Sequence, residues 1–351
     1  MTVPAGDTPG GLPLRLSGLR RAQRRRRAGI VAALSLLLAS ACVLTLTVGQ
    51  TVTPLPEVLR VLSGHEVPGA GFTVGTLRLP RMIVAVLAGA AFGLGGAACQ
   101  TLLRNPLASP DVIGITAGSG AAAVFAIVIL NWTGTAVAIL SVAGGLGTAL
   151  LIHGLAWRDG VLGARLILVG IGLSAMLNSM IAYLLARAPA WSLQDALRWL
   201  TGSVNGATLD QALPVLLSLV LFGGTLLVRH GRLEAMRLGD DTAAALGVAL
   251  GREKMLTVLC AVGLVAVATA VAGPVAFVAF LSGPIALRIA GAGTSPLVPA
   301  ALIGAMLMLV GDFIGQHLLT SRYPVGVVTG ALGAPYLVFL IVRANRTGRV
   351  T

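Results

Sequence analysis

Long apolar runs separated by short polar breaks make up most of this chain of 351 residues. Each run is close to the ~20 residues that an α-helix needs to cross the roughly 30 Å of hydrocarbon in a bilayer. The pattern therefore predicts an all-α polytopic membrane protein with about ten transmembrane helices. We expect these helices near residues 28–48, 80–100, 111–130, 134–157, 161–187, 209–229, 254–272, 274–290, 296–317 and 325–343.

The composition agrees with this class. Hydrophobic residues make up 56% of the chain, charged residues 11%, and the mean hydropathy is +0.92. This apolar content exceeds what a soluble core of the same length needs. The cysteines Cys42, Cys99 and Cys260 all fall inside predicted spans, where a free thiol behaves as a small apolar side chain. We therefore expect neither a disulfide framework nor a metal site.

The basic residues are distributed unevenly between the two sides of the predicted membrane. With a cytoplasmic N-terminus, 19 of the 25 lie on the cytoplasmic side, and the other six are Arg60, Arg78, Arg81, Arg187, Arg198 and Arg322. This excess follows the positive-inside rule, and an even number of spans then places both termini in the cytoplasm. The same bias explains the net charge of +13 without a nucleic-acid partner.

The basic run from Arg20 to Arg27 joins the first apolar segment in the manner of a signal peptide. That segment continues to about Val48, and no small-residue cleavage pattern stands out from its surroundings. We expect a retained first helix. The predicted organisation is a basic cytoplasmic N-terminal tail, 1–27, a ten-helix transmembrane domain, 28–343, and a cytoplasmic tail, 344–351.

A polar turn, residues 104–111, separates the second and third spans. Proline ends one helix here, and the side chain of Ser109 or Asp111 can cap the next helix by accepting hydrogen bonds from its free amides. From the residues alone, this is a tight cytoplasmic turn. Its structural residues are Asn105, Pro106, Ser109 and Pro110.

Residues 87–120, which contain this turn and Gly114, closely resemble the FecCD-type permease family of ABC importers, whose members carry siderophores, haem and cobalamin. Residues 200–203 are similar to the family's segment after the fifth helix, and residues 324–330 with 333–335 are similar to its last helix. These motifs follow the family's order over most of the chain. The resemblance implies a permease subunit in the bacterial cytoplasmic membrane, energised by a separate ATPase.

A second segment, about residues 236–250, lies in the longest predicted cytoplasmic loop and is too short to span. Asp240 or Asp241 can cap a helix start, Ala243 favours helix, and Gly247 can end it, so we expect one short helix at the inner face. Without the resemblance this would be a solvated interfacial helix. The resemblance implies a coupling helix docked in a groove of the ATPase through Gly239, Asp240, Asp241, Ala244, Leu246 and Gly247.

Two arginines, Arg78 and Arg81, flank Pro80 at the outer entrance of the second span. A charged pair is costly within lipid and tolerated at its edge, so interfacial anchoring is one interpretation. Alternatively, two outward guanidiniums can bind carboxylates of a docking protein with two hydrogen bonds each. The resemblance implies this second role, with an extracytoplasmic substrate-binding protein as the partner.

Asp312 is the carboxylate that lies clearly inside a late span. An intramembrane carboxylate is a functional candidate by default, as a proton or cation site. The alternative is a structural partner of a helix end or an arginine, and the family resemblance favours this alternative.

The sequence contains no recognisable catalytic group. Lys254 is the only lysine and follows Glu253, so no GK[ST] phosphate-binding loop is present. The four histidines are widely spaced, and no Ser/His/Asp or metal-ligand grouping appears. We therefore expect a chain that is not an enzyme and binds no cofactor, with ATP and Mg²⁺ held by a partner subunit.

The chain departs from the family pattern at two places. Gly283 and Pro284 occupy positions where the family has proline and histidine, and Gln316 replaces an arginine four residues after Asp312, which leaves Arg322 as the nearest outward cation. These departures resemble the second permease of ferric catecholate systems. We therefore favour a heterodimer with a second permease subunit over a homodimer, together with two ATP-binding subunits and the substrate-binding protein.

The resulting hypothesis is an ABC permease that translocates a ferric siderophore, with haem or cobalamin as alternative cargo. The rival from a different class is an ion-coupled secondary transporter, which needs an intramembrane ionisable network or broken helices in matching halves. The sequence offers only Asp312 and scattered polar residues such as Asn178. A membrane enzyme would need convergent nucleophile, base or metal ligands, which we do not find.

Overall fold

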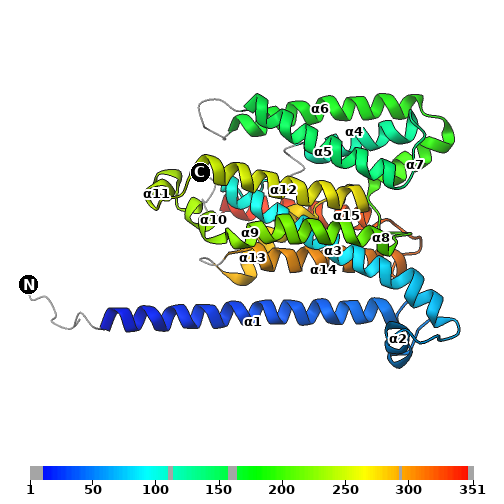
Figure 1. Ribbon diagram of the computed structural model, residues 1–351, viewed down its shortest axis with the longest axis horizontal. Coiled ribbons are helices and arrows are strands. Elements are labelled where there is room, and N and C mark those ends of the chain that lie inside the picture. Colours follow the sequence, from blue (N-terminus) through cyan, green and yellow to red (C-terminus); the bar gives the residue numbers. More distant parts are fainter. Residues whose placement is uncertain (1–10, 110–113, 157–163, 292–294, 347–351) are drawn as a thin grey trace, which may run out of the picture.

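The computed structural model describes residues 11–109, 114–156, 164–291 and 295–346, and every regular element within these ranges is helical (Figure 1). Two of the elements, η1 and η2, have π-helical geometry. The elements in chain order are α1 Gly11–Thr47, α2 Leu55–Leu62, η1 Gly71–Arg78, α3 Leu79–Leu103, α4 Ile115–Val128, α5 Thr135–Ala156, α6 Ala164–Arg187, α7 Ala190–Thr201, α8 Leu209–Ser218, η2 Leu219–Gly223, α9 Gly224–Val228, α10 His230–Arg237, α11 Asp240–Ala245, α12 Leu250–Ala272, α13 Val278–Ala290, α14 Leu297–His317 and α15 Val325–Arg346.

Each of the ten predicted spans coincides with a helix. Within the described residues, seven helical stretches are long and apolar enough to cross a membrane. The remaining three predicted spans correspond to shorter apolar helices, Ile115–Val128, Val278–Ala290 and Val325–Leu340. The chain is therefore an all-helical polytopic membrane protein, as predicted.

Several helix bounds differ from those of the predicted spans. α1 begins at Gly11, well before residue 28, so much of the predicted N-terminal tail is helical. The predicted outer loop between the first two spans contains α2 and η1. The eighth span begins as helix only at Val278, because Gly273 and Phe277 adopt left-handed φ angles of 71° and 66° that a right-handed helix cannot accommodate. The start of the predicted span 111–130 falls on residues outside the described ranges.

α3 lies at the centre of the larger helix group. Its buried face packs against α14, α12, α13 and α8. Glycines allow the closest of these contacts: a Cβ atom on Gly89 would lie 2.4 Å from the carbonyl oxygen of Gly304, and one on Gly93 would lie 2.2 Å from that of Ala300. The four-residue spacing of Gly89 and Gly93 therefore brings the backbones of α3 and α14 together.

A smaller group contains α4, α5, α6 and α7 and has its own apolar core around Val124, Ile127 and Ile181. In Figure 1 this green group lies above the α3 group, and α12 packs against both α3 and α5. The long helix α1 lies along the opposite side, where it packs mainly on α14. Exposed apolar side chains on α1, such as Leu36 and Leu37, and on α6, such as Leu168, Ile171 and Met176, match a lipid-facing surface.

Pro284 lies inside α13 and leaves the carbonyl of Phe280, four residues earlier, without its helical N–H donor. The side chain of Gln100 from α3 donates its Nε2 to this carbonyl at 2.9 Å. Gly283 makes room for the same amide, since a Cβ atom there would lie 1.8 Å from Gln100 Oε1. At the Gly283–Pro284 departure from the family pattern, the side chain of Gln100 on the central helix α3 therefore supplies the hydrogen bond that the proline removes.

Candidate functional site

The predicted short helix of the cytoplasmic loop is present as α11, which extends beyond the end of α12 (Figure 1). Gly239, with φ 119°, is the N-cap residue, and no side chain caps the helix. The prediction that Asp240 or Asp241 is the cap is therefore wrong, because the helix begins at Asp240 itself. Gly247 follows the helix with φ 82°, which confirms its predicted role as a terminator.

The carboxylate of Asp240 binds partners on the membrane-spanning helices, and its side chain is 42% exposed. Its Oδ2 accepts a hydrogen bond from Lys254 Nζ at 2.5 Å, and its Oδ1 forms an ion pair with Arg104 Nη2. The hydrogen bond from Lys254 lowers the pKa of the Asp240 carboxyl below its ordinary value, and the positive charges of Lys254 and Arg104 act in the same direction against the effect of burial. The carboxylate is therefore held in its charged form.

The other side of α11 is exposed. Ala243 is fully buried, whereas Asp241, Ala244 and Leu246 point away from the protein. Leu246 is 64% exposed, and Leu238, just before the helix, is 66% exposed. Apolar side chains exposed beside a loop rich in charge are typical of a protein–protein contact. Leu238 was not among the predicted site residues, although its position next to Gly239 could have indicated it.

The polar turn after α3 is ordered by its own hydrogen bonds. Arg104 has a left-handed φ of 50°, and the side-chain oxygen of Asn105 accepts a hydrogen bond from the amide of Leu107 at 2.9 Å. Pro106 is exposed, whereas Ser109 is buried. The N-cap of α4 is Gly114, so the prediction that Ser109 caps this helix is wrong. Pro110 and Asp111 lie outside the described residues. The turn presents Arg104 to the loop that contains α11.

A second ion-pair cluster joins α12 to the start of α10. The carboxylate of Glu253, 4% exposed, receives hydrogen bonds from Arg229 at 2.5 Å and from Arg232 at 2.6 Å. Sequence reasoning used Glu253 only to exclude a phosphate-binding loop and missed this role, as it missed the partners of Arg104 and Lys254. Charged residues in the first turn of an apolar span were the available signal, because such residues need partners.

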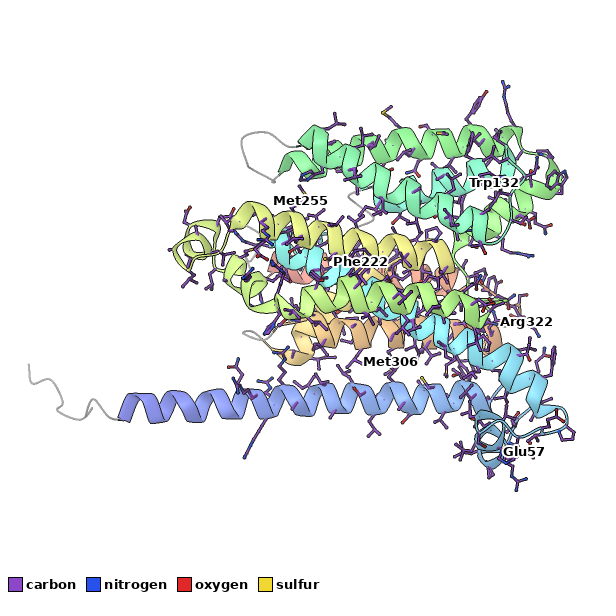
Figure 2. All side chains as sticks on the ribbon, in the orientation of Figure 1. Glu57, Trp132, Phe222, Met255, Met306 and Arg322 are labelled. Atoms are coloured by element: carbon purple, nitrogen blue, oxygen red, sulfur yellow. The ribbon has the colours of Figure 1, made fainter. Side chains whose placement is uncertain are left out.

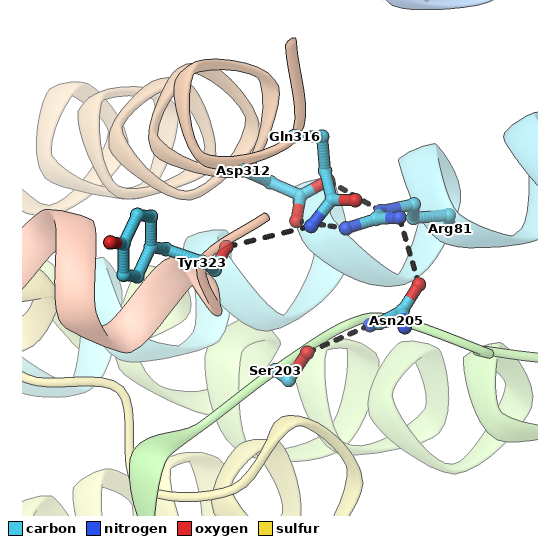
Figure 3. A network of polar contacts seen from close by, with 6 residues as sticks. All are labelled: Arg81, Ser203, Asn205, Asp312, Gln316 and Tyr323. Atoms are coloured by element: carbon cyan, nitrogen blue, oxygen red, sulfur yellow. Dashed lines mark hydrogen bonds and ion pairs between the residues drawn. The ribbon is translucent and has the colours of Figure 1, made fainter. Parts of the chain in front are cut away.

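At the opposite end of the helix bundle, Arg81 and Asp312 form a two-armed ion pair (Figure 3). Arg81 Nε lies 2.6 Å from Asp312 Oδ2, and Nη2 lies 2.7 Å from Oδ1. Arg81 Nη1 also donates to Asn205 Oδ1 at 3.1 Å. The pair joins α3, α14 and the connection between α7 and α8. Asp312 is thus paired with an arginine, which agrees with its interpretation as a structural partner and not with a free proton or cation site.

Arg78 binds the backbone at the end of α1 and just after it. Its Nη1 donates to the carbonyl oxygen of Leu46 at 2.9 Å, and its Nη2 donates to that of Thr51 at 2.7 Å. Both arginines predicted to dock a partner therefore make contacts within the chain. Arg322 is exposed at the same end of the molecule (Figure 2), and no ion pair or hydrogen bond of its side chain is found within the described residues.

A cavity of about 260 Å³ lies between these residues. Gln316, which replaces the arginine expected from the family pattern, donates weakly to the carbonyl oxygen of Tyr323 at 3.5 Å (Figure 3). The cavity wall carries three guanidinium groups against one carboxylate, so an anionic group is the ligand type that fits it. Its charged and polar lining includes Arg78, Arg81, Asp312, Gln316, His317 and Arg322.

An apolar cavity of about 590 Å³ lies beside α13 and α15. Phe277, in its left-handed conformation, packs on Gly333, where a Cβ atom would lie 2.4 Å from the ring, and meets Phe280 edge-on with 6.2 Å between ring centroids. Apart from Ser109 and Thr116, the lining is apolar and includes Leu107, Leu200, Val275 and Leu337. Among the described residues, no group of three histidine, cysteine or acidic side chains could hold a metal ion.

The comparisons with known proteins agree with this architecture. Residues 36–343 match the model of the FecCD transport family. The chain is 42% identical over 318 residues to the ferric enterobactin transport system permease protein FepG of Escherichia coli (strain K12), covering 89% of this chain and 96% of that protein. It is 33% identical over 327 residues to the permease protein FepD of the same named system and organism, covering 92% and 97%.

A solved structure gives the same result for the fold. A putative metal-chelate type ABC transporter in an inward-facing conformation superimposes with a TM-score of 0.81 at 26% identity, covering 90% of this chain and 99% of that one. The helical architecture, the family match over most of the chain and the relatives above 30% identity lead to one conclusion. The chain is a membrane permease that belongs to the FecCD transport family.

Proposed function

We propose that this chain is the membrane-spanning subunit of an ABC importer that moves a ferric siderophore across the bacterial cytoplasmic membrane. The observation that carries the proposal is the 42% identity to a ferric enterobactin permease over 96% of that relative. Further matches include the achromobactin permease of Dickeya dadantii (strain 3937), at 35% identity. A catecholate siderophore is the substrate we infer, with haem and cobalamin as the alternatives to exclude.

The proposed topology has ten spans with both termini in the cytoplasm. The excess of basic residues on one side supports this orientation, since 19 of 25 lie there. In this arrangement α11 is on the cytoplasmic side, and the Arg81–Asp312 pair and Arg322 are on the outer side.

The proposed energy source is ATP hydrolysed with Mg²⁺ by two separate subunits. The exposed side of α11, with Asp241, Ala244 and Leu246, is the surface we assign to that contact, because its apolar side chains have no partner within the described chain. Closure of the ATPase subunits would displace α11 and favour one of two conformations of the permease, which is the requirement for alternating access.

The proposed outer partner is a substrate-binding protein. Arg322 is the outward cation that is free to meet a carboxylate on it, while the remaining donors of Arg78 and Arg81 supply the positive field of the outer cavity. A second, related permease subunit is expected beside this chain, because two different permease proteins of one named system both match it. The apolar cavity beside α13 would then line the pathway of a large chelate.

The geometry does not favour an ion-coupled secondary transporter. Asp312 is the carboxylate such a mechanism would use, and it is bound by both arms of Arg81. Protonation of Asp312 would leave a largely buried guanidinium without its counter-charge, which is costly.

ATP-dependent uptake tests the proposed function. Vesicles containing this chain, a candidate second permease and ATPase subunits would be loaded with ATP and given radiolabelled ferric enterobactin with its binding protein. Uptake that requires ATP, persists with a proton uncoupler and is not competed by haem or cobalamin is the expected result. Uptake without ATP that the uncoupler abolishes would refute the proposal and support the secondary transporter.

A further inference from the structure

The two carboxylate oxygens of Asp240 connect α11 to two different membrane-spanning helices. Oδ2 accepts a hydrogen bond from Lys254, near the start of α12, at 2.5 Å, and Oδ1 pairs with Arg104 at the end of α3. Arg104 also donates its Nε to the carbonyl oxygen of Met236, the residue before the last in α10, at 2.8 Å. α11, α12 and the end of α3 therefore meet at one acidic residue, and α3 is distant from the other two in sequence.

Apart from the contacts of Asp240, α11 packs mainly on the neighbouring short helix α10. α11 is six residues long, too short to be stable as an isolated helix, and Ala243 is its one buried residue. Gly239 and Gly247, on either side of it, have positive φ angles of 119° and 82°. The polar contacts of Asp240 connect α11 directly to the spans α3 and α12.

The two ion pairs of Asp240, with Lys254 and with Arg104, differ in strength. The side chain of Lys254 is 11% exposed, so removal of Asp240 would leave a buried ammonium group without a counter-charge. The Arg104–Asp240 arm is about two-fifths exposed on both sides, and exposed pairs contribute little to stability. Its contribution is instead geometric, because it ties α11 to the helix that packs on α14, α12, α13 and α8.

We propose that Asp240, Arg104 and Lys254, here called the Asp240 anchor, are positioning residues that make α11 move as one body with α3 and α12. Asp240 binds these helices and leaves the partner contact to Asp241, Ala244 and Leu246. This inference rests on the proposed function, in which a partner ATPase displaces α11. Without the anchor, the ATPase still binds and hydrolyses ATP, but the loop absorbs the displacement and the spans do not follow.

The test compares coupling in the complete reconstituted importer. The variants are Lys254→Met, which keeps the buried volume and removes the charge, and Asp240→Asn. Glu234→Gln is the matched control, because the Glu234–Arg237 pair, 3.0 Å apart, lies within α10 and joins no two elements. The measured quantities are ferric enterobactin imported per ATP hydrolysed and the amount of ATPase that copurifies with the permease.

We expect both anchor variants to retain the ATPase and to import at least about fivefold less substrate per ATP, a change typical of lost coupling between sites. Lys254→Arg, which restores the charge, recovers the ratio, and Glu234→Gln leaves it unchanged. A ratio for Lys254→Met equal to that of the unaltered complex would overturn the inference. Equal loss in Glu234→Gln, or loss of ATPase binding in both anchor variants, would overturn it as well.

The two proposals fail in different ways. If the unaltered complex itself shows no ATP-dependent uptake, the proposed function is wrong, and this inference is wrong with it. If the unaltered complex imports the chelate and the anchor variants match its ratio, only the inference is wrong.

Discussion

Arg81 shows how one side chain can hold one end of the helix bundle together. Its guanidinium binds both oxygens of Asp312 and the amide oxygen of Asn205, so it joins α3, α14 and the connection before α8. The side chains of Arg81 and Asp312 are 20% and 9% exposed. A buried ion pair of this kind contributes little compared with apolar side chains of the same size, but loss of one partner is strongly destabilising.

Asp312→Asn is therefore expected to lower the free energy of unfolding by about 3–5 kcal/mol, because Arg81 keeps its charge and loses its counter-charge. The combined variant Arg81→Met with Asp312→Leu recovers much of this loss. Thermal unfolding of the purified permease in detergent measures both. Asp210→Asn is the control, since Asp210 is exposed in the first turn of α8, and we expect a change within about 0.5 kcal/mol. Full stability of Asp312→Asn together with loss of uptake would contradict the structural role and point to proton transfer.

At the scale of elements, α3 combines two kinds of contact. Glycines let it approach α14 and α13 to backbone distance, and Gln100 repairs the hydrogen bond that Pro284 removes from α13. These contacts depend on each other, because the carboxamide of Gln100 occupies the space that Gly283 leaves open. The contact between α3 and α13 therefore depends on a specific hydrogen bond, whereas the contact between α3 and α14 depends on the close packing of the two backbones.

The α3–α13 contact predicts a non-additive pair of substitutions. Gly283→Ala places a methyl group against Gln100 and should destabilise the protein, while Gln100→Ala leaves the Phe280 carbonyl without a donor at a cost of about 1–3 kcal/mol. The double variant should lose at least about 0.5 kcal/mol less than the sum of the single variants, since the clash is absent once Gln100 is shortened. Thermal unfolding of all three variants checks this, and strict additivity would contradict it.

The α3–α14 contact predicts a difference between two glycines. Gly93→Ala directs a Cβ atom at the backbone of Ala300, which cannot move aside, so we expect a loss of about 1–3 kcal/mol. Gly147→Ala in α5 meets no atom within 4 Å and should be neutral or slightly stabilising, because alanine favours helix over glycine. The measurement is the midpoint of thermal unfolding of each variant. Equal midpoints for the two variants would mean that the helices separate more easily than the structure indicates.

At the scale of the whole molecule, the hydrophobic pattern was sufficient to locate a helix at each of the ten predicted positions, since each apolar run is long compared with the breaks between them. Seven of these helical stretches are long and apolar enough to cross a membrane within the described residues. The pattern could not show α2 or η1, because they lie in a mixed segment between two spans. It also could not show which charges meet. Arg81 and Asp312 are 231 residues apart in sequence, and Arg104 and Asp240 are 136 apart. Such pairs follow from the packing of helices, which a single sequence does not specify.

The proposed orientation predicts which positions face the outside. Arg322→Cys and Leu246→Cys would be placed in a chain whose Cys42, Cys99 and Cys260 are replaced by alanine. A membrane-impermeant maleimide added to intact cells should label position 322 and spare position 246. Both should react once the cells are broken and the ATPase subunits have been removed from the membrane. The reverse labelling pattern would place α11 outside and exclude its contact with a cytoplasmic ATPase.

The central helix is also fastened at each of its two ends. Arg81, in its first turn, is held by Asp312 and Asn205, and Arg104, just after its last turn, is held by Asp240 and the carbonyl oxygen of Met236. Its 25 residues form a helix about 38 Å long. A helix held at both ends cannot slide along its axis without displacing the residues bound to it. In the proposed orientation, we therefore expect a displacement at the cytoplasmic face to reach the outer face with similar size. Loss of the contacts of Arg81 or of Arg104 would free one end of α3 to move independently of the other end.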